Sequence, residues 1–303
     1  MRLVFTLVAT CAILTTSLQA QVDPLYSQYL NNPFLINPAY TGMNKYMNLM
    51  VGYRKQWAGF DGSPTTLSAT GHTSLMDNRM GVGLIISQDK VGENTNTFVQ
   101  GTYAYKVRFD DYRYISFGLQ AGIMNFKSDN SELNIADPSD PLFNSNQNVI
   151  SPSFGAGVIY RTDNLFLGLS VPRMLKASES YDDVTAALYT QHFYGFASYV
   201  FLLSNRVKLK PAVLFRAVSG SPLSTDINFQ FNIDERYAVG LLTRNFNTYG
   251  LLAQIKFNEF RFGYVFEMPT NKSVGTNFTS HEITLGLNLS VFGFHDLTQV
   301  SDF

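Results

Sequence analysis

The chain has 303 residues, of which 15% are charged and 14% are aromatic, and its formal net charge at pH 7 is −1. A balance this close to zero excludes the broad basic surface of a nucleic-acid-binding protein, so no nucleic acid is expected as a partner. The single cysteine, Cys11, lies within the first 20 residues. Neither disulfides nor thiol chemistry is therefore expected in the rest of the chain.

Residues 1–20 have the layout of a secretory signal peptide. Arg2 gives a positive start, an apolar stretch follows, and Ala20 is a small residue before the expected cleavage site. The apolar stretch is shorter than the roughly 20 residues that cross a bilayer as a helix. The sequence therefore predicts export through a cleaved signal peptide.

Residues 21–45 form a second, irregular segment. It contains Pro24, Pro33 and Pro38 among several aromatic residues, which favours ordered structure without regular helix or strand. Two interpretations stay open: the segment plugs the lumen of the domain that follows, or it presents a docking surface in the periplasm.

Residues 46–292 alternate between apolar and small or polar side chains. In the stretch from Ile115 to Ile123, for example, every second residue is apolar and the residues between are Ser, Gly or Gln. Such a period-two pattern is typical of strands with one apolar face. About 14 strands are predicted, at 46–57, 64–75, 80–89, 96–109, 112–126, 151–161, 164–172, 188–203, 206–217, 224–233, 236–245, 247–257, 260–267 and 279–292.

The polar faces carry mostly Gly, Ser, Thr, Asn and Gln, whereas a soluble sandwich would place many charges there. In lipid, only closure into a barrel leaves no strand edge unpaired. We therefore expect an all-β, transmembrane antiparallel β-barrel in a bacterial outer membrane, followed by a C-terminal tail at 293–303.

The predicted connections sort by length around the barrel. If the junctions are numbered in chain order from the one after the first predicted strand, odd and even junctions lie at opposite ends of the barrel. The even-numbered junctions are short, whereas the long ones, 127–150, 173–187 and 268–278, are all odd-numbered. Outer-membrane barrels have short periplasmic turns and longer external loops. The sorting therefore places both termini in the periplasm.

Some charged residues stand at strand positions that alternate with the outward apolar ones, and are said below to have inner parity. These charged residues are mainly basic. The basic members are Arg54, Lys106, Arg108, Lys208, Lys210, Arg216, Arg236, Arg244, Lys256 and Arg261, and the acidic ones are Asp226, Asp234, Glu267 and Glu282. One interpretation is a passage or pocket for anions. The other is a lumen filled by inward ion pairs, with solvated charges at its rim.

Catalysis has little support in the sequence. His72 and His192 have inner parity, so a buried triad acting on lipids is conceivable, but no histidine has the spacing of a zinc site. The acidic loop from Asp129 to Asp140 lacks the spacing of an EF-hand. We expect a non-enzymatic protein without a catalytic residue, metal or cofactor.

The N-terminal quarter contains a series of motifs in a specific order and spacing. They are Asp23-Pro24, Tyr26-Ser27-Gln28-Tyr29, Asn37-Pro38-Ala39-Tyr40-Thr41-Gly42, Tyr53-Arg54-Lys55-Gln56-Trp57-Ala58-Gly59-Phe60, Gly62 and Pro64-Thr65-Thr66. These motifs resemble the start of the PorP/SprF family of Bacteroidetes outer-membrane proteins. The resemblance implies a role in type IX secretion and gliding motility, in export and surface attachment of a secreted adhesin.

The implied partners are that adhesin and other secretion components, either the translocon or periplasmic ring proteins, besides outer-membrane lipid. Within the matching motifs, the candidate partner-binding residues are Tyr26, Tyr29, Asn37, Pro38, Tyr40, Arg54, Trp57 and Phe60. A role of the stretch from Trp57 to Pro64 as a simple turn stays open. The alternative function is a porin or channel for small solutes, with anions as one option.

Overall fold

The computed structural model describes residues 26–110, 112–129, 146–181, 184–270 and 277–295. Within these ranges lie two short 3-10 helices, η1 (Pro33–Leu35) and η2 (Pro38–Tyr40), and strands numbered β1 to β17. No helix in the described ranges has the length and apolarity needed to cross a membrane. The expected signal peptide, residues 1–20, lies outside the described residues, as does 296–303 of the expected tail.

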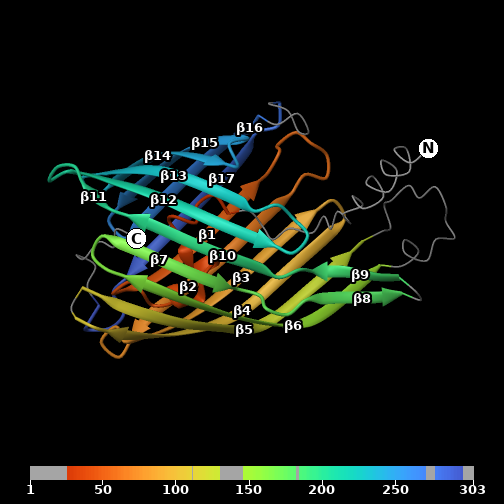
Figure 1. The fold of residues 1–303 in the computed structure, drawn as a ribbon, viewed down its shortest axis with the longest axis horizontal. Coiled ribbons are helices and arrows are strands. Elements are labelled where there is room, and N and C mark those ends of the chain that lie inside the picture. Colours follow the sequence, from red (N-terminus) through yellow and green to blue (C-terminus); the bar gives the residue numbers. More distant parts are fainter. Residues whose placement is uncertain (1–25, 111, 130–145, 182–183, 271–276, 296–303) are drawn as a thin grey trace, which may run out of the picture.

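The strands follow one another along the chain with short connections (Figure 1). They are β1 (Met47–Lys55), β2 (Thr65–Leu75), β3 (Met80–Val91), β4 (Asn94–Arg108), β5 (Tyr114–Ser128), β6 (Gln147–Arg161), β7 (Leu165–Val171), β8 (Ala177–Tyr181), β9 (Val184–Tyr189), β10 (His192–Tyr199), β11 (Phe201–Leu202), β12 (Val207–Val218), β13 (Ser224–Ile233), β14 (Tyr237–Arg244), β15 (Thr248–Phe257), β16 (Phe260–Pro269) and β17 (Ser280–Leu289).

All strands except β8 and β9 belong to one antiparallel sheet that closes on itself. Each strand pairs with its neighbours in the chain, and β1 pairs with β17, from Met47 opposite Leu289 to Lys55 opposite His281. Strands β10 and β11 follow one another and both pair with β12. The described part of the chain is therefore a closed barrel of 14 strands.

The period-two prediction is confirmed strand by strand. Every predicted segment overlaps a strand of the barrel, and the bounds of β13 are those predicted, 224–233. The segment 188–203, apolar on both faces, is interrupted at Val200, which separates β10 from β11. Alternation predicts these strands reliably because each strand has an apolar environment on one side and the lumen on the other.

The two ends of the barrel differ in their connections. At one end, the short-turn end, β2–β3, β4–β5, β6–β7, β11–β12, β13–β14 and β15–β16 are joined by tight turns. The other end, the long-loop end, carries the long connections 129–146, 172–191 and 270–279. Two junctions at this end are also tight, at 92–93 and 245–247, and they use Gly92, Asn245 and Phe246 with positive φ.

The connection 173–187, predicted as a loop, contains the hairpin β8–β9, which extends beyond the barrel at the long-loop end (Figure 1). Its base is fixed by Tyr189 and Ala177, which pack with Phe98 of β4 in a buried cluster. The Arg173 guanidinium lies 4.4 Å from the centre of the Phe98 ring and 5.4 Å from that of Tyr189. Such cation–π contacts orient the hairpin against the barrel wall.

The two faces of the sheet have opposite chemistry. Outward side chains are large and apolar, and many are exposed, among them Leu119 at 62%, Leu169 at 64% and Leu251 at 57%. Inward positions hold buried polar residues such as Ser68, Gln100 and Asn228. A continuous apolar outer band with a polar interior is the arrangement that lipid requires of a transmembrane barrel.

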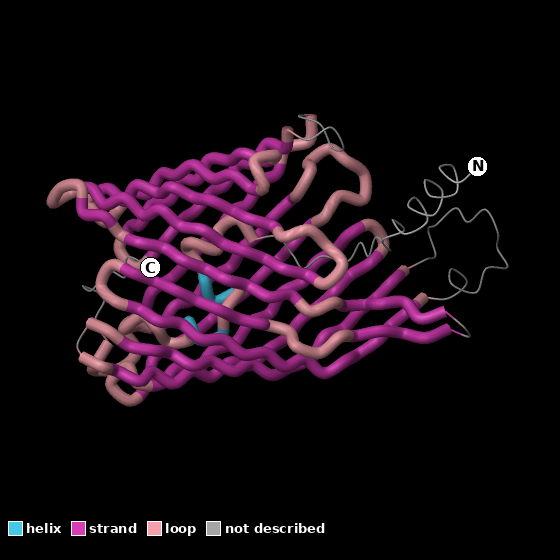
Figure 2. The backbone as a smooth tube through the Cα atoms, in the orientation of Figure 1, coloured by secondary structure: helices cyan, strands magenta, loops and turns pink. Residues whose placement is uncertain are grey.

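A barrel of this size has a lumen wider than its own side chains fill, because even 8 strands leave only just enough room for them. Residues 26–46, called the inner segment below, occupy that lumen. Both 3-10 helices lie inside the barrel in Figure 2. Tyr29, Leu30, Phe34 and Ala39 are at most 1% exposed, so the inner segment is the core of the molecule.

Candidate functional site

The inner segment is shaped by its two prolines and one asparagine. Pro33 and Pro38 each occupy the first position of a 3-10 helix, where a missing N–H costs nothing. Asn37 caps the second helix, because its Oδ1 accepts a hydrogen bond from the Ala39 amide at 2.9 Å. Its Nδ2 donates to the carbonyls of Val158 and Leu169, at 3.3 and 3.2 Å, and so connects the segment to β6 and β7.

Glycines of the barrel wall let the inner segment approach the strands. A Cβ at Gly118 would lie 2.1 Å from the Ala39 amide nitrogen, and one at Gly157 would lie 2.1 Å from Asn37 Oδ1. At Gly81 it would lie 2.2 Å from the Thr41 carbonyl oxygen. No side chain fits in these gaps, so the glycines of β3, β5 and β6 are required by the segment.

Side chains of the barrel wall donate hydrogen bonds to carbonyls of the inner segment. Ser170 donates to the Ile36 carbonyl at 2.6 Å, and Ser116 donates to that of Ala39 at 2.7 Å. Lys106 of β4 donates to the Gly42 carbonyl. These partners satisfy backbone groups that would otherwise be buried without a hydrogen bond.

Aromatic rings hold the middle of the inner segment. Tyr29 meets Phe196 edge-on at 5.9 Å between ring centres, and Phe34 meets His72 at 4.8 Å. Tyr40 also contacts the His72 ring, at 5.7 Å. Edge-to-face pairs of this kind stabilise the packing beyond the effect of burying apolar surface.

A buried ion network fixes the start of the inner segment in the half of the lumen near the long-loop end. Arg54 of β1 pairs with Glu267 of β16 at 2.5 Å and with Glu282 of β17 at 3.3 Å. Ser27 lies between them: its hydroxyl donates to Glu267 at 2.5 Å and its amide to Glu282 at 2.7 Å. Arg54 in turn donates to the Ser27 hydroxyl at 2.8 Å.

A second arginine extends this network to β13 and β14. Arg244 pairs with Asp226 at 2.9 Å and reaches Glu267 at 3.4 Å. The side chains of both arginines and of their carboxylate partners are at most 8% exposed. Burying charges is tolerated here because each is paired and hydrogen-bonded.

Charge is distributed unevenly along the barrel axis. The carboxylates of inner parity on the described strands, Asp89, Asp226, Glu267 and Glu282, all lie in the half near the long-loop end. The half near the short-turn end has basic inward residues instead, namely Lys106, Arg161, Lys210, Lys256 and Arg261. Buried ion pairs therefore fill the half near the long-loop end, and basic side chains line the other half.

The turn after β1 forms part of the rim at the long-loop end. Trp57 adopts a positive φ of 52°, which is uncommon for a bulky residue. The Trp57 amide donates to Ser280 Oγ at 3.1 Å, and the Ala58 amide donates to the Thr279 carbonyl at 2.7 Å, so the turn is joined to β17. Phe60 packs edge-on against Phe278 at 5.6 Å and is still 54% exposed.

The structure divides the residues that the sequence suggested as partner-binding. Tyr26, Tyr29, Asn37, Pro38, Tyr40 and Arg54 are buried within the barrel, where they contact other parts of this chain. Trp57 and Phe60 lie at the rim. The buried motif residues therefore shape and anchor the inner segment. Ser27 and Gln28, which belong to the same motif, were not among the suggested residues although they bind Glu267 and Glu282.

The histidines take part in packing. His72 accepts a hydrogen bond from the Gly42 amide at 3.2 Å, and His192 bonds to the Thr190 carbonyl at 2.8 Å. Across the described ranges, no group of three His, Cys, Asp or Glu residues is arranged to hold a metal ion. Of the acidic loop from Asp129 to Asp140, only Asp129 lies within the described residues.

Two solved structures illustrate what this fold is similar to. The monoaromatic hydrocarbon channel CymD is 12% identical, with a TM-score of 0.53 over 89% of this chain and 94% of that one. A Pseudomonas aeruginosa FadL homologue is 11% identical, with a TM-score of 0.50 over 90% and 96%. At this level of identity the likeness concerns the fold. No curated protein matches the chain.

The fold, the apolar outer band and the similar structures define the class: this is an outer-membrane β-barrel protein, with a segment of its own chain inside the lumen. Residues 18–287 match the family described as type IX secretion system membrane protein PorP/SprF. The chain belongs to this family, and the resemblance seen in the N-terminal motifs is thereby confirmed.

Proposed function

We propose that this barrel holds a secreted adhesin at the cell surface and assists its export as a non-enzymatic component of type IX secretion. The observation that carries the proposal is the filled lumen. A diffusion channel needs an open passage, whereas the inner segment is bonded to β2, β4, β5, β6, β7, β16 and β17. A protein that blocks its own pore is better suited to binding at its ends.

In the proposed orientation the long-loop end faces outward and the short-turn end faces the periplasm, as is usual for outer-membrane barrels. The rim formed by Trp57 and Phe60 then presents aromatic groups to a secreted client. Exposed aromatic residues in such a setting are typical anchors of protein interfaces. Other secretion components would be reached from the short-turn end or through the lipid-facing wall.

Affinity purification of the tagged protein from its native outer membrane, with mass spectrometry of the bound proteins, tests the proposal. Recovery of a large secreted adhesin supports it and names the client. A strain without the protein should lose that adhesin from its surface while its permeability to small solutes is unchanged. Normal surface proteins together with reduced solute uptake in that strain would favour the channel.

A further inference from the structure

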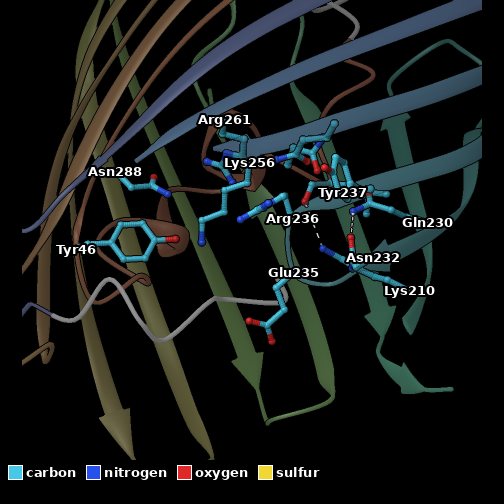
Figure 3. A pocket seen from close by; sticks show the side chains of 14 residues that line it. Tyr46, Lys210, Gln230, Asn232, Glu235, Arg236, Tyr237, Lys256, Arg261 and Asn288 are labelled. Atoms are coloured by element: carbon cyan, nitrogen blue, oxygen red, sulfur yellow. Dashed lines mark hydrogen bonds between the residues drawn. The ribbon is translucent and has the colours of Figure 1, made fainter. Parts of the chain in front are cut away.

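The short-turn end of the barrel has a polar pocket that the proposed function does not use. Strands β12 to β17 contribute to its wall, and Leu30, Asn31 and Tyr46 of the inner segment also line it. Figure 3 shows the side chains of Arg236, Lys256 and Arg261 in this pocket. The cavity has a volume of about 80 Å³, which is room for several water molecules or one small group. The pocket is therefore a recess of limited depth.

Four cationic side chains line this pocket. Lys210 donates to the Leu30 carbonyl at 3.4 Å, and the other three, Arg236, Lys256 and Arg261, come from the turn before β14 and from β15 and β16. Lys256 on β15 lies directly opposite Arg261 on β16 in the strand register. Arg236 lies in the neighbouring turn, and its carbonyl accepts a hydrogen bond from the Lys256 amide at 2.7 Å. Like charges placed directly opposite one another on a sheet are destabilising. The arrangement thus costs free energy in the protein alone, and a bound anion would relieve that cost.

The chain itself supplies little negative charge to this pocket. Its only carboxylate is Glu235, whose side chain is 52% exposed and pairs with Lys208 at 3.1 Å. Within the described residues, Arg236, Lys256 and Arg261 form no ion pair. Arg261 Nε is buried and has no hydrogen-bond partner. This donor is therefore available to a group from outside the chain.

The opposite half of the same lumen makes the contrast clear. There Arg54 and Arg244 are each paired with carboxylates at 2.5 to 3.4 Å. The lack of an ion pair at Arg236, Lys256 and Arg261 within the described residues is therefore a local property. It is not a general consequence of placing arginine in this barrel.

We infer that the pocket binds one oxyanion, a phosphate or carboxylate group, between Lys256, Arg261 and Arg236. Arginine offers several donors in a fixed plane that matches both groups, and the lysine adds a point charge. Two sources share this chemistry: a free phosphate ion, and the carboxylate of an acidic side chain inserted by another protein. The inference does not depend on the proposed role in adhesin attachment.

Calorimetric titration of the purified full chain in detergent tests the inference. One arm uses inorganic phosphate, and the other uses a short peptide with one glutamate, compared with the same peptide carrying glutamine. Saturable binding is expected in at least one arm, and increasing salt should weaken it because the cations are partly exposed. The double variant Lys256→Gln, Arg261→Gln should bind at least about tenfold more weakly, since two charge-assisted hydrogen bonds are lost.

Arg79→Gln is the matched control, because Arg79 is an exposed arginine in another turn of the short-turn end, outside the pocket. This variant should bind as the wild type does. Binding of phosphate alone identifies a free anion as the ligand, whereas binding of the glutamate peptide alone identifies a protein carboxylate. The inference fails if neither binds, or if the double variant, still folded by its heat-dependent gel mobility, binds as tightly as wild type.

Discussion

Arg54 and Glu267 form an ion pair of 2.5 Å with side chains only 4% and 1% exposed, and the Ser27 hydroxyl is hydrogen-bonded to both. Ser27 precedes Glu267 by 240 residues in the chain. One contact therefore connects the inner segment, the first strand and the penultimate strand of the barrel. The inner segment thereby supplies a hydrogen-bond partner to both members of an ion pair of the wall.

Replacing Arg54 should reveal how strongly the network stabilises the barrel. In Arg54→Gln, Glu267 and Glu282 lose their shared cation, and removing one partner of a buried pair costs about 3–5 kcal/mol. We expect the free energy of unfolding in detergent, measured by urea titration, to fall by about this amount. The control is Arg113→Gln, which removes an exposed pair with Asp110, and its effect should stay below about 1 kcal/mol. Equal effects of the two variants would contradict this account.

The sequence predicted the barrel wall because lipid and pleating together impose a period of two on each strand. The hairpin β8–β9 was missed, since it extends beyond the barrel, where no lipid-facing side enforces alternation. The contacts of the inner segment were not predictable either. They join Ser27 to Glu267, and Asn37 to Val158 and Leu169, across distances in the chain that local patterns do not encode.

In the candidate site, too, the sequence predicted which face of the wall a residue occupies but not which residues it contacts. The alternation assigned Lys256 and Arg261 correctly to the inner face, and the excess of base there is real in one half of the lumen. Which cations are paired depends on strand register and on the inner segment, as the pairing of Arg244 with Asp226 shows. For the segment around Tyr29 and Asn37 the sequence left both a plug and a docking surface open, because a single sequence does not distinguish a segment that binds its own barrel from one that binds another protein.

Adding one methyl group inside the barrel should displace the inner segment. In Gly118→Ala the new Cβ would lie 2.1 Å from the Ala39 amide nitrogen, so η2 has to move away from β5. We expect a loss of about 1–3 kcal/mol in stability and a higher conductance in planar bilayers, as the lumen opens. Gly195→Ala is the matched control, because its nearest neighbour would lie at an ordinary 3.6 Å. Unchanged conductance in a folded Gly118→Ala barrel would argue that the segment does not block the pore.

Acid should weaken one contact between turns at the short-turn end. Arg206 donates two hydrogen bonds of 2.6 Å to Asp234 and holds the pKa of that carboxyl below its ordinary 3.8. Because the folded-state pKa is lowered, the contribution to stability is present above pH 3.8 and is lost as the pH falls through the folded-state pKa. Wild type should therefore unfold at a slightly higher temperature than Asp234→Asn at pH 7, with a gap that narrows at lower pH. A gap that is constant with pH would exclude this linkage.

An exposed aromatic residue at the rim should decide whether the client binds there. In Phe60→Ala the ring that packs on Phe278 is lost, while the backbone bond from Ala58 to Thr279 can still hold the turn. Truncating an aromatic anchor of an interface typically costs more than about 1–2 kcal/mol, so recovery of the adhesin in affinity purification should fall at least about fivefold. Phe109→Ala is the control, since Phe109 is 60% exposed at the opposite end. If Phe109→Ala reduced recovery and Phe60→Ala did not, the client would be held at the short-turn end, and the proposed orientation of binding would have to be reversed.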